Sequence, residues 1–147
     1  MPDNELFVAE TAGRYAHKPP LVVDCSALAA VLFDEPGRDA AALAMAGKAL
    51  FAPDLLDHEI VSVALKKSAA GYADAARQAL ADLAALQLTR CRVEATAQFE
   101  LAERTGLTAY DAAYLQLALE LRAPLTTFDR KLGKVASKVL SDAQESD

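Results

Sequence analysis

The sequence predicts an α/β fold built on a parallel β-sheet with helices on both of its faces. Short apolar runs typical of buried strands alternate along the chain with longer alanine- and leucine-rich runs that favour helix. Strands separated by helices pair in parallel, because a crossover helix returns the chain to the same end of the sheet. The 147 residues are enough for one domain with a sizeable core, and no internal repeat divides them.

The first half of the chain contains two predicted strands and three predicted helices: a strand over 21–24, helices over 27–33 and 38–47, a strand over 49–52 and a helix over 55–67. Both strands (LVVD and ALFA) are short and apolar, which is typical of parallel strands buried on both faces. Ser26 is a good N-cap for the first helix, and Asp54 with Asp57 fits a capping box at the start of the third.

The alternation continues in the second half with helices over 72–86, 94–105 and 109–122, strands over 88–93 and 124–128, a short helix from Asp129 and a last strand over 138–140. Gly106 is expected to be a helix C-cap, and Thr108 the N-cap of the next helix. We therefore expect a domain over residues 21–140. Residues 1–20, which end in HKPP, are predicted to be an N-terminal extension, and the polar residues 141–147 a disordered tail.

The composition excludes several classes of protein. Cys25 and Cys91 are too few for a disulfide scaffold or a zinc site. No apolar run approaches the ~18 residues needed to cross a membrane, and the acidic N-terminus does not resemble a secretory signal, so we expect a cytoplasmic protein. Residues 21–140 carry 13 basic and 15 acidic side chains, a balance that neither indicates nor excludes nucleic-acid binding.

Two acidic residues come directly after predicted strands. Asp24 ends the first strand, and Asp129 follows the strand over 124–128. Ligands of open parallel sheets bind beyond the carboxyl ends of the strands. Both carboxylates are therefore expected at the edge of the sheet where chemistry is usually done, although Asp129 also fits the role of a helix N-cap.

Two further acids lie on predicted helices. At 100° per residue, Asp111 falls on the apolar side of its helix, where a lone ionised carboxylate is costly and needs a cation partner or a shared site. Glu59 lies beside a polar stripe that is either the wall of a cleft or plain surface. Asp111 with Thr108 also fits a capping box. Each acid alone has a structural explanation, but four at strand ends and helix starts together point to a site.

Such a set of carboxylates suits a hard cation. Carboxylate oxygens are ligands for Mg²⁺ or Mn²⁺, and a cation held in this way can activate water for phosphodiester cleavage. Other sites fit less well. The CSALAA sequence after the first strand lacks the glycines of a dinucleotide-binding turn, and no histidine is placed to activate Cys25 as a nucleophile.

Three blocks of the sequence resemble the motif blocks of PIN-domain ribonucleases, and they are most similar to the VapC-type toxins of toxin–antitoxin modules. The blocks are VVDCSAL, PDLLDHEIVSVAL and LTAYDAAYLQLALELRAPLTTFDRKL, and the resemblance spans about residues 21–140. It implies a three-layer α/β/α PIN fold and an endoribonuclease that needs Mg²⁺ or Mn²⁺. It assigns catalytic and metal-binding roles to four acids and helper roles to two hydroxyls: Asp24, Glu59, Asp111 and Asp129, with Ser26 and Thr127.

The resemblance also implies an RNA substrate, a cognate antitoxin protein and a homodimer. Four basic residues after Asp129 recur at helical spacing and form either a phosphate-binding rim or a solvated helix face: Arg130, Lys131, Lys134 and Lys138. We expect the antitoxin to lie along apolar helix surface around 55–65 and 39–46 and to insert a basic residue among the acids. The alternative to an enzyme is a catalytically silent PIN-fold module for binding or assembly.

Overall fold

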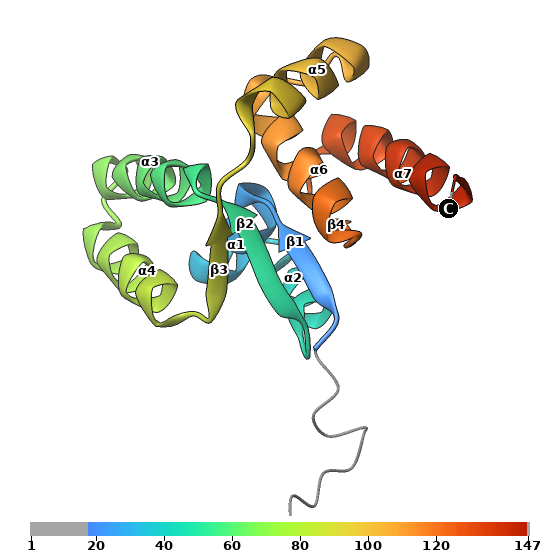
Figure 1. Ribbon diagram of the computed structural model, residues 1–147. Helices are drawn as coiled ribbons and strands as arrows, with labels where there is room; N and C mark the ends of the chain where they lie inside the picture. The colour runs from blue at the N-terminus through green and yellow to red at the C-terminus, as the bar shows by residue number, and fades with distance from the viewer. Residues whose placement is uncertain (1–17, 147) are drawn as a thin grey trace, which may run out of the picture.

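The chain folds around a four-stranded parallel β-sheet between layers of helices (Figure 1). The computed structural model describes residues 18–146. The strands are β1 (Pro20–Val23), β2 (Ala49–Pro53), β3 (Leu88–Cys91) and β4 (Leu125–Thr126), in the spatial order β3-β2-β1-β4. The helices are α1 (Cys25–Leu32), α2 (Arg38–Met45), α3 (Leu55–Ala69), α4 (Ala73–Ala85), α5 (Ala95–Thr105), α6 (Ala109–Leu121) and α7 (Arg130–Glu145). The predicted α/β fold class with a central parallel sheet is confirmed.

The central strand β1 is buried on both faces, which explains its apolar sequence. Val22 belongs to a core cluster with Leu117 of α6, whereas Leu21 and Val23 pack with Leu50 of β2 in another cluster. Successive side chains of a strand point to opposite faces of the sheet. Each face therefore needs its own helical cover.

Helix α6 packs against the sheet and also against α5 and α7. A further core cluster joins these three helices through Leu101 of α5, Leu115 of α6 and Leu132 of α7, all of them buried. Because α6 has apolar neighbours on several sides, it is apolar around most of its circumference. This packing fixes the start of α6, where Asp111 lies.

The predicted cap of α1 is wrong by two residues. Helix α1 begins at Cys25, so Asp24 is its N-cap, and the Asp24 carboxylate accepts a hydrogen bond from the backbone N–H of Ala27 (3.0 Å). Ser26 lies inside the helix and uses its hydroxyl for other contacts. Strand β1 thus ends one residue earlier than predicted, and Asp24 lies at the junction between β1 and α1.

The predicted capping box at the start of α3 is also wrong. Asp54 has helical backbone angles (φ −53°, ψ −30°) and makes no side-chain cap hydrogen bond. Asp57 instead accepts two hydrogen bonds from the guanidinium of Arg90, at 3.0 Å and 2.9 Å. This bidentate pair joins α3 to β3. By contrast, Gly106 closes α5 with a φ of 72°, and Thr108 caps α6, as predicted.

The C-terminal region differs most from the prediction. A single helix of 16 residues, α7, replaces the predicted short helix, the strand over 138–140 and the start of the predicted disordered tail. Leu132 and Ala136 are buried on one face of α7, and Val139 and Leu140 continue it. Spacings of three and four residues form a helical stripe. The apolar pair that suggested a strand is the last part of this stripe.

The predicted N-terminal extension lies mostly outside the described residues, which begin at Lys18, and Pro20 already belongs to β1. Among residues 18–146, no helix is long and apolar enough to cross a membrane.

Candidate active site

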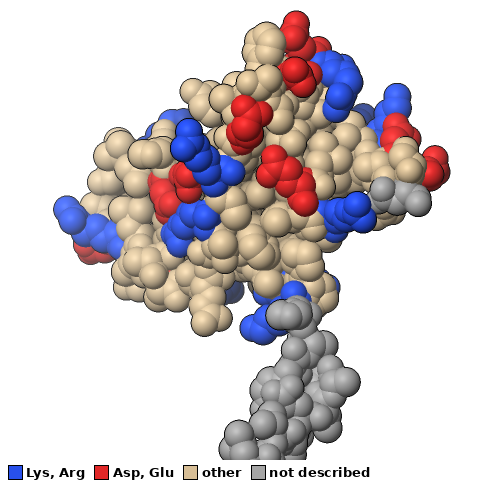
Figure 2. All heavy atoms as spheres, in the orientation of Figure 1, with Lys and Arg blue, Asp and Glu red and all other residues tan. Residues whose placement is uncertain are grey.

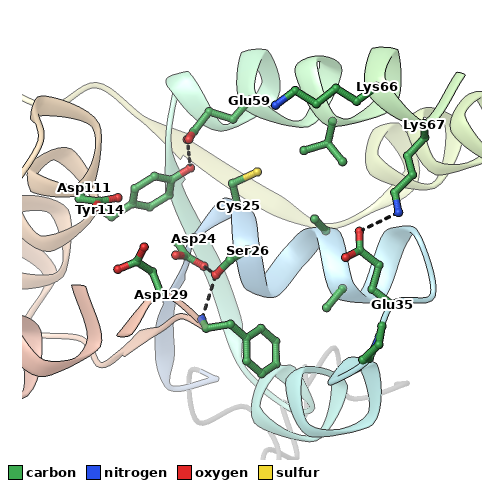
Figure 3. A pocket seen from close by; sticks show the side chains of 15 residues that line it. Asp24, Cys25, Ser26, Glu35, Glu59, Lys66, Lys67, Asp111, Tyr114 and Asp129 are labelled. Atoms are coloured by element: carbon green, nitrogen blue, oxygen red, sulfur yellow. Dashed lines mark hydrogen bonds and ion pairs between the residues drawn. The ribbon is translucent and has the colours of Figure 1, made fainter. Parts of the chain in front are cut away.

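A pocket of about 760 Å³ opens where α1, α3 and α6 meet the loop between β4 and α7 (Figure 3). All four acids that the sequence singles out line it: Asp24, Glu59, Asp111 and Asp129. The sheet register explains part of this convergence. Val23 of β1 pairs with Thr126 of β4, so the residues that follow these strands leave the sheet at the same edge.

Asp24 is the most buried of the four acids, with 5% of its surface exposed. Its Oδ1 accepts hydrogen bonds from the Ser26 hydroxyl (2.7 Å) and the Ala27 N–H, and its Oδ2 accepts one from the Thr127 hydroxyl (2.5 Å). Burial raises the pKa of the Asp24 carboxyl and the charge of Asp129 adds to this, while the three hydrogen bonds oppose the rise. The carboxylate is therefore held in one orientation.

The two hydroxyls also tie Asp24 to the loop that carries Asp129. Ser26 donates to Asp24 and accepts from the backbone N–H of Phe128 (2.9 Å). Thr127 donates to Asp24 and accepts from the backbone N–H of Asp129 (2.9 Å). Each hydroxyl donates its proton to the Asp24 carboxylate, and its oxygen accepts a hydrogen bond from a backbone N–H of the loop. The junction of β1 and α1 is thereby linked to the junction of β4 and α7.

Glu59 reaches the pocket from α3 and is held by a tyrosine. The Tyr114 hydroxyl of α6 donates a hydrogen bond to Glu59 Oε1 at 2.6 Å (Figure 3). Burial raises the pKa of Glu59, and the charges of Asp24 and Asp111 raise it further. The hydrogen bond from Tyr114 opposes this rise in the pKa. Burial and the bonded carboxylate both raise the pKa of Tyr114, so its hydroxyl is a donor at every ordinary pH.

Asp111 and Asp129 complete the acidic set from two helix starts. Asp111 donates its backbone N–H to Thr108 Oγ1 (3.1 Å), which leaves its side chain to face the pocket. Burial raises the pKa of Asp111, the charges of Asp129 and Asp24 raise it further, and the charge of Lys131 and a hydrogen bond with Thr108 oppose the rise. Asp129 is the N-cap of α7 and accepts the N–H of Leu132 through Oδ1 (2.8 Å). Asp111 and Asp129 can therefore each take part in the start of a helix and also line the pocket.

The pocket concentrates negative charge, and the charge of Lys131 offsets part of it at Asp111. Asp24, Glu59 and Asp111 each feel the repulsion of other acids of the set. Cys25 lies in the same field, and burial with these charges raises the pKa of its thiol to about 12. A thiol that stays protonated is a poor nucleophile. The pocket suits a bound cation better than a cysteine nucleophile.

The four carboxylates do not lie close enough together to form a compact metal-binding site. Among residues 18–146, no group of three histidine, cysteine or acidic side chains lies close enough to hold a metal ion directly. The donors are nevertheless hard oxygen ligands, and the raised pKa values of Asp24, Glu59 and Asp111 favour a neutralising partner. Mg²⁺ loses its water reluctantly and is often bound through one or two carboxylates with several waters kept. An open set of carboxylates fits that kind of site.

The predicted basic rim on α7 does not line this pocket. Arg130, Lys131 and Lys134 are exposed outside its lining, and Lys131 Nζ donates a hydrogen bond to the Gly106 carbonyl (2.8 Å). The basic residues in the lining are Lys66 and Lys67 of α3. Figure 2 shows lysine and arginine side chains interspersed with acids over this face of the molecule, without a broad basic patch.

Two aromatic residues of the lining were not predicted to contribute to a site. Tyr114 is buried in the core, and its hydroxyl also holds Glu59. The available signal was its position three residues after Asp111, on the same face of the helix. Phe128 also lines the pocket. The only indication in the sequence that Phe128 would line the site was its position directly before Asp129.

The fold and the pocket define a three-layer α/β protein with four carboxylates at the carboxyl-terminal edge of a parallel sheet. The sequence profile of the PIN domain matches residues 21–138, and the chain belongs to this family. PIN domains are generally nucleases, so the protein has a nuclease-type fold.

A solved structure supports the same fold. The protein PAE2754 from Pyrobaculum aerophilum is 23% identical and superposes with a TM-score of 0.65. The similarity covers 87% of this chain and 91% of PAE2754. No curated protein sequence matches the chain.

Proposed function

We propose that the protein is an endoribonuclease that depends on Mg²⁺ or Mn²⁺ and hydrolyses RNA phosphodiesters in the cytoplasm. The convergence of Asp24, Glu59, Asp111 and Asp129 on one pocket carries this proposal. Family membership supports the nuclease class, and the hard-oxygen donor set supports the choice of cation.

The residues of the pocket have separate roles in this proposal. The four carboxylates would hold the cation, which when bound supplies an activated water and offsets charge on the phosphate. Ser26 and Thr127 keep the Asp24 carboxylate oriented through their hydrogen bonds. Orientation matters because a catalytic group displaced by about an ångström can lose on the order of a hundredfold in rate.

The test is RNA cleavage by the purified full-length protein. We expect cleavage of a mixed RNA pool with Mg²⁺ or Mn²⁺ and none after EDTA. Asp24→Asn should reduce cleavage strongly, because a neutral amide is a much weaker ligand than a carboxylate. Asp74→Asn, at an exposed acid of α4 outside the pocket, is the matched control and should cleave like the wild type. Equal cleavage by Asp24→Asn and wild type would refute the proposal.

A catalytically silent module for binding or assembly is the second candidate. The observation in its favour is that no three candidate ligands among residues 18–146 meet closely enough for direct metal binding. Thermal melting separates the two candidates. If the acids bind Mn²⁺, millimolar Mn²⁺ should raise the melting temperature of the wild type, and Asp24→Asn, which removes one of the four carboxylates, should reduce the shift. An unchanged melting temperature in the wild type would favour the silent module.

We further propose that the nuclease is the toxin of a toxin–antitoxin pair and is restrained by a small antitoxin protein. Exposed apolar side chains on α2 and α3 support a docking surface there: Leu43 is 79% exposed and Leu65 is 67% exposed. A shallow apolar cavity between α3 and α4 adjoins Leu65. An arginine that the antitoxin inserts into the pocket would pair with its carboxylates.

Co-expression with the neighbouring gene, followed by co-purification, tests the antitoxin proposal. We expect a complex whose nuclease activity is suppressed, and weaker binding for Leu65→Glu on the docking surface. A chain that is harmless when expressed alone and retains no partner would contradict the toxin role, whatever its nuclease activity.

We also propose that the protein forms a homodimer. Sedimentation at several protein concentrations tests this directly.

A further inference from the structure

The turn between α1 and α2 contacts the loop that carries Asp129. The ring of Phe128, the residue before Asp129, rests on Gly37, where an added Cβ would lie 2.8 Å from Cζ and 3.1 Å from Cε1 of the ring. Carbon atoms in favourable contact are about 3.5–4.0 Å apart, so any side chain at position 37 would displace the ring. Phe128 can take its place because residue 37 is a glycine.

This turn is fixed by backbone hydrogen bonds. The N–H of Glu35 bonds to the Ala30 carbonyl, and the N–H of Arg38 bonds to the Glu35 carbonyl, each at 3.0 Å. Gly37 has a φ of 92°, which favours glycine, and its carbonyl accepts the N–H of Ala41 at 3.0 Å as α2 begins. The surface beneath the aromatic ring is therefore a rigid one.

Asp129 needs to be held in place because other acids of the pocket repel it. The charge of Asp129 raises the pKa of Asp24 and of Asp111, so these like charges act on one another. Figure 3 shows the three carboxylates at the same end of the pocket. Their repulsion favours an outward movement of the loop between β4 and α7, and the contacts of this loop oppose that movement.

The loop has two hydrogen-bonded anchors that lead to the same part of the chain. Thr127 donates to Asp24, and the backbone N–H of Phe128 donates to Ser26 Oγ at 2.9 Å. Asp24 and Ser26 both lie at the junction of β1 and α1. Two neighbouring anchors leave a loop able to pivot about the line that joins them. Because α1 separates Gly37 from this junction, the ring contact is a third anchor at a separate point.

We propose that Gly37 and Phe128 are positioning residues for Asp129: the Phe128 ring, seated on Gly37, keeps the Asp129 carboxylate directed into the pocket against the repulsion of the other acids. This role rests on the proposed metal-dependent function, because it gives Asp129 the orientation that a bound cation needs. Neither positioning residue is itself a ligand. Groups that orient a metal ligand without touching the metal typically contribute about 10- to 100-fold to metal affinity or activity.

Gly37→Ala is the direct test. The added methyl group should displace the ring, and the affinity of the full chain for Mn²⁺, measured by titration calorimetry, should fall about 10- to 100-fold. Gly71→Ala is the matched control, because Gly71 has a similar φ of 99° and, among residues 18–146, no atom beyond its chain neighbours within 4 Å of an added Cβ. Both variants should lose stability through backbone strain, but Gly71→Ala should bind Mn²⁺ like the wild type.

A second substitution tests whether the effect passes through the ring. Phe128→Leu removes the ring atoms that touch Gly37, so it should weaken Mn²⁺ binding by itself. In the Phe128→Leu protein, Gly37→Ala has no ring to displace and should lower the affinity no further, since residues in contact have coupled effects. Additive losses of affinity from the two substitutions would overturn the proposal.

Hydrogen exchange in EDTA reports on the loop without metal or RNA. The informative backbone N–H groups are those of Phe128, Asp129 and Leu132, because each is hydrogen-bonded within the loop or to its anchors. They should exchange faster in Gly37→Ala than in Gly71→Ala. Equal exchange in the two variants overturns the proposal. Faster exchange without a loss of Mn²⁺ affinity also contradicts it, because the contact would then be structural only.

These readouts separate the positioning role from the proposed function. If the wild type neither binds Mn²⁺ nor cleaves RNA, but Gly37→Ala loosens the loop only when Phe128 is present, the ring does position the loop and the metal-dependent nuclease is wrong. If the wild type cleaves RNA with Mn²⁺, but Gly37→Ala equals Gly71→Ala in affinity and exchange, the nuclease stands and the positioning role is wrong.

Discussion

At the scale of single residues, the site depends on polar contacts that hold its acids in position. Tyr114 is almost completely buried and gives its only hydroxyl proton to Glu59 Oε1. This contact offsets part of the cost of burying the Glu59 carboxylate and leaves Oε2 as the freer oxygen. Tyr114 therefore acts as a positioning residue for Glu59.

Tyr114→Phe removes this hydrogen bond while keeping the packed ring. We expect a loss of about 1.5–3 kcal/mol in the free energy of unfolding, the range for hydrogen bonds to charged groups. The Mn²⁺-induced rise in melting temperature should also shrink, because Glu59 loses its fixed orientation. Tyr110→Phe, at an exposed tyrosine of the same helix, is the control for both measurements. A variant with lower stability but an unaltered Mn²⁺ response would restrict Tyr114 to a packing role.

Asp111 allows a test of the electrostatic repulsion among the acids of the pocket. Burial and the nearby acids raise its pKa in the folded protein above the ordinary value of 3.8. A raised carboxyl pKa means that the folded state binds the proton more tightly than the unfolded state. Its destabilising contribution is therefore absent below that ordinary value and grows as the pH rises through the folded-state pKa.

Asp111→Asn should consequently raise the melting temperature at neutral pH in EDTA, and this gain should diminish as the pH is lowered towards 3.8. Asp39→Asn, at an exposed acid in the first turn of α2, should give no such gain, because it removes a favourable interaction with the helix dipole. Thermal melts of both variants across pH provide the measurement. If Asp111→Asn lowers the melting temperature at every pH, Asp111 acts mainly as a stabilising acid at the start of α6.

At the scale of elements, sequence periodicity predicted ten of the eleven helices and strands in order, and it was least successful at the C-terminus. The apolar pair Val139 and Leu140 fits a short strand when taken alone. It also fits a helical stripe with Leu132 and Ala136, and their burial against α5 and α6 decides between the two. That burial is a tertiary property, which a local pattern of three residues does not contain.

Ser137→Pro tests whether α7 is one continuous helix. A proline in the middle of the helix removes a backbone hydrogen bond and clashes with the preceding turn, so we expect a loss of about 3 kcal/mol or more. The same change would be tolerated in a turn between a short helix and a strand. Ala95→Pro is the control, because it occupies the first position of α5, where proline is accepted. Similar melting temperatures for the two variants would contradict a continuous α7.

At the scale of the whole molecule, the sequence predicted the acids of the site better than the contacts around them. Asp24 and Asp129 could be placed because parallel strands end at one edge, a rule that needs no coordinates. The hydrogen bonds from Thr127 to Asp24 and from Phe128 to Ser26 join residues about a hundred positions apart and depend on the pairing of β1 with β4. Glu59 was ambiguous for a similar reason. Its helix has a polar stripe, and only the position of α6 shows that this stripe borders a cavity.

The overall charge of the protein makes a final prediction about RNA binding. The chain carries a formal net charge of −6, and five acids line the pocket with only two basic residues, Lys66 and Lys67. Long-range attraction to a polyanion should therefore contribute little, and few counterions should be released on binding. For one or two phosphate contacts on a single strand, log K should fall with log salt with a slope of only about −0.7 to −1.4 at fixed Mg²⁺.

Fluorescence anisotropy over a salt series measures this slope for the protein carrying Asp24→Asn. Removing Mg²⁺ should weaken binding further, because the carboxylates would then repel the phosphate backbone without compensation. A slope of several units would show that RNA contacts a larger basic surface, and Arg130 with Lys134 on α7 would be the first residues to substitute. A shallow slope that requires Mg²⁺ is the expected result for a protein that recognises RNA inside the acidic pocket rather than across its surface.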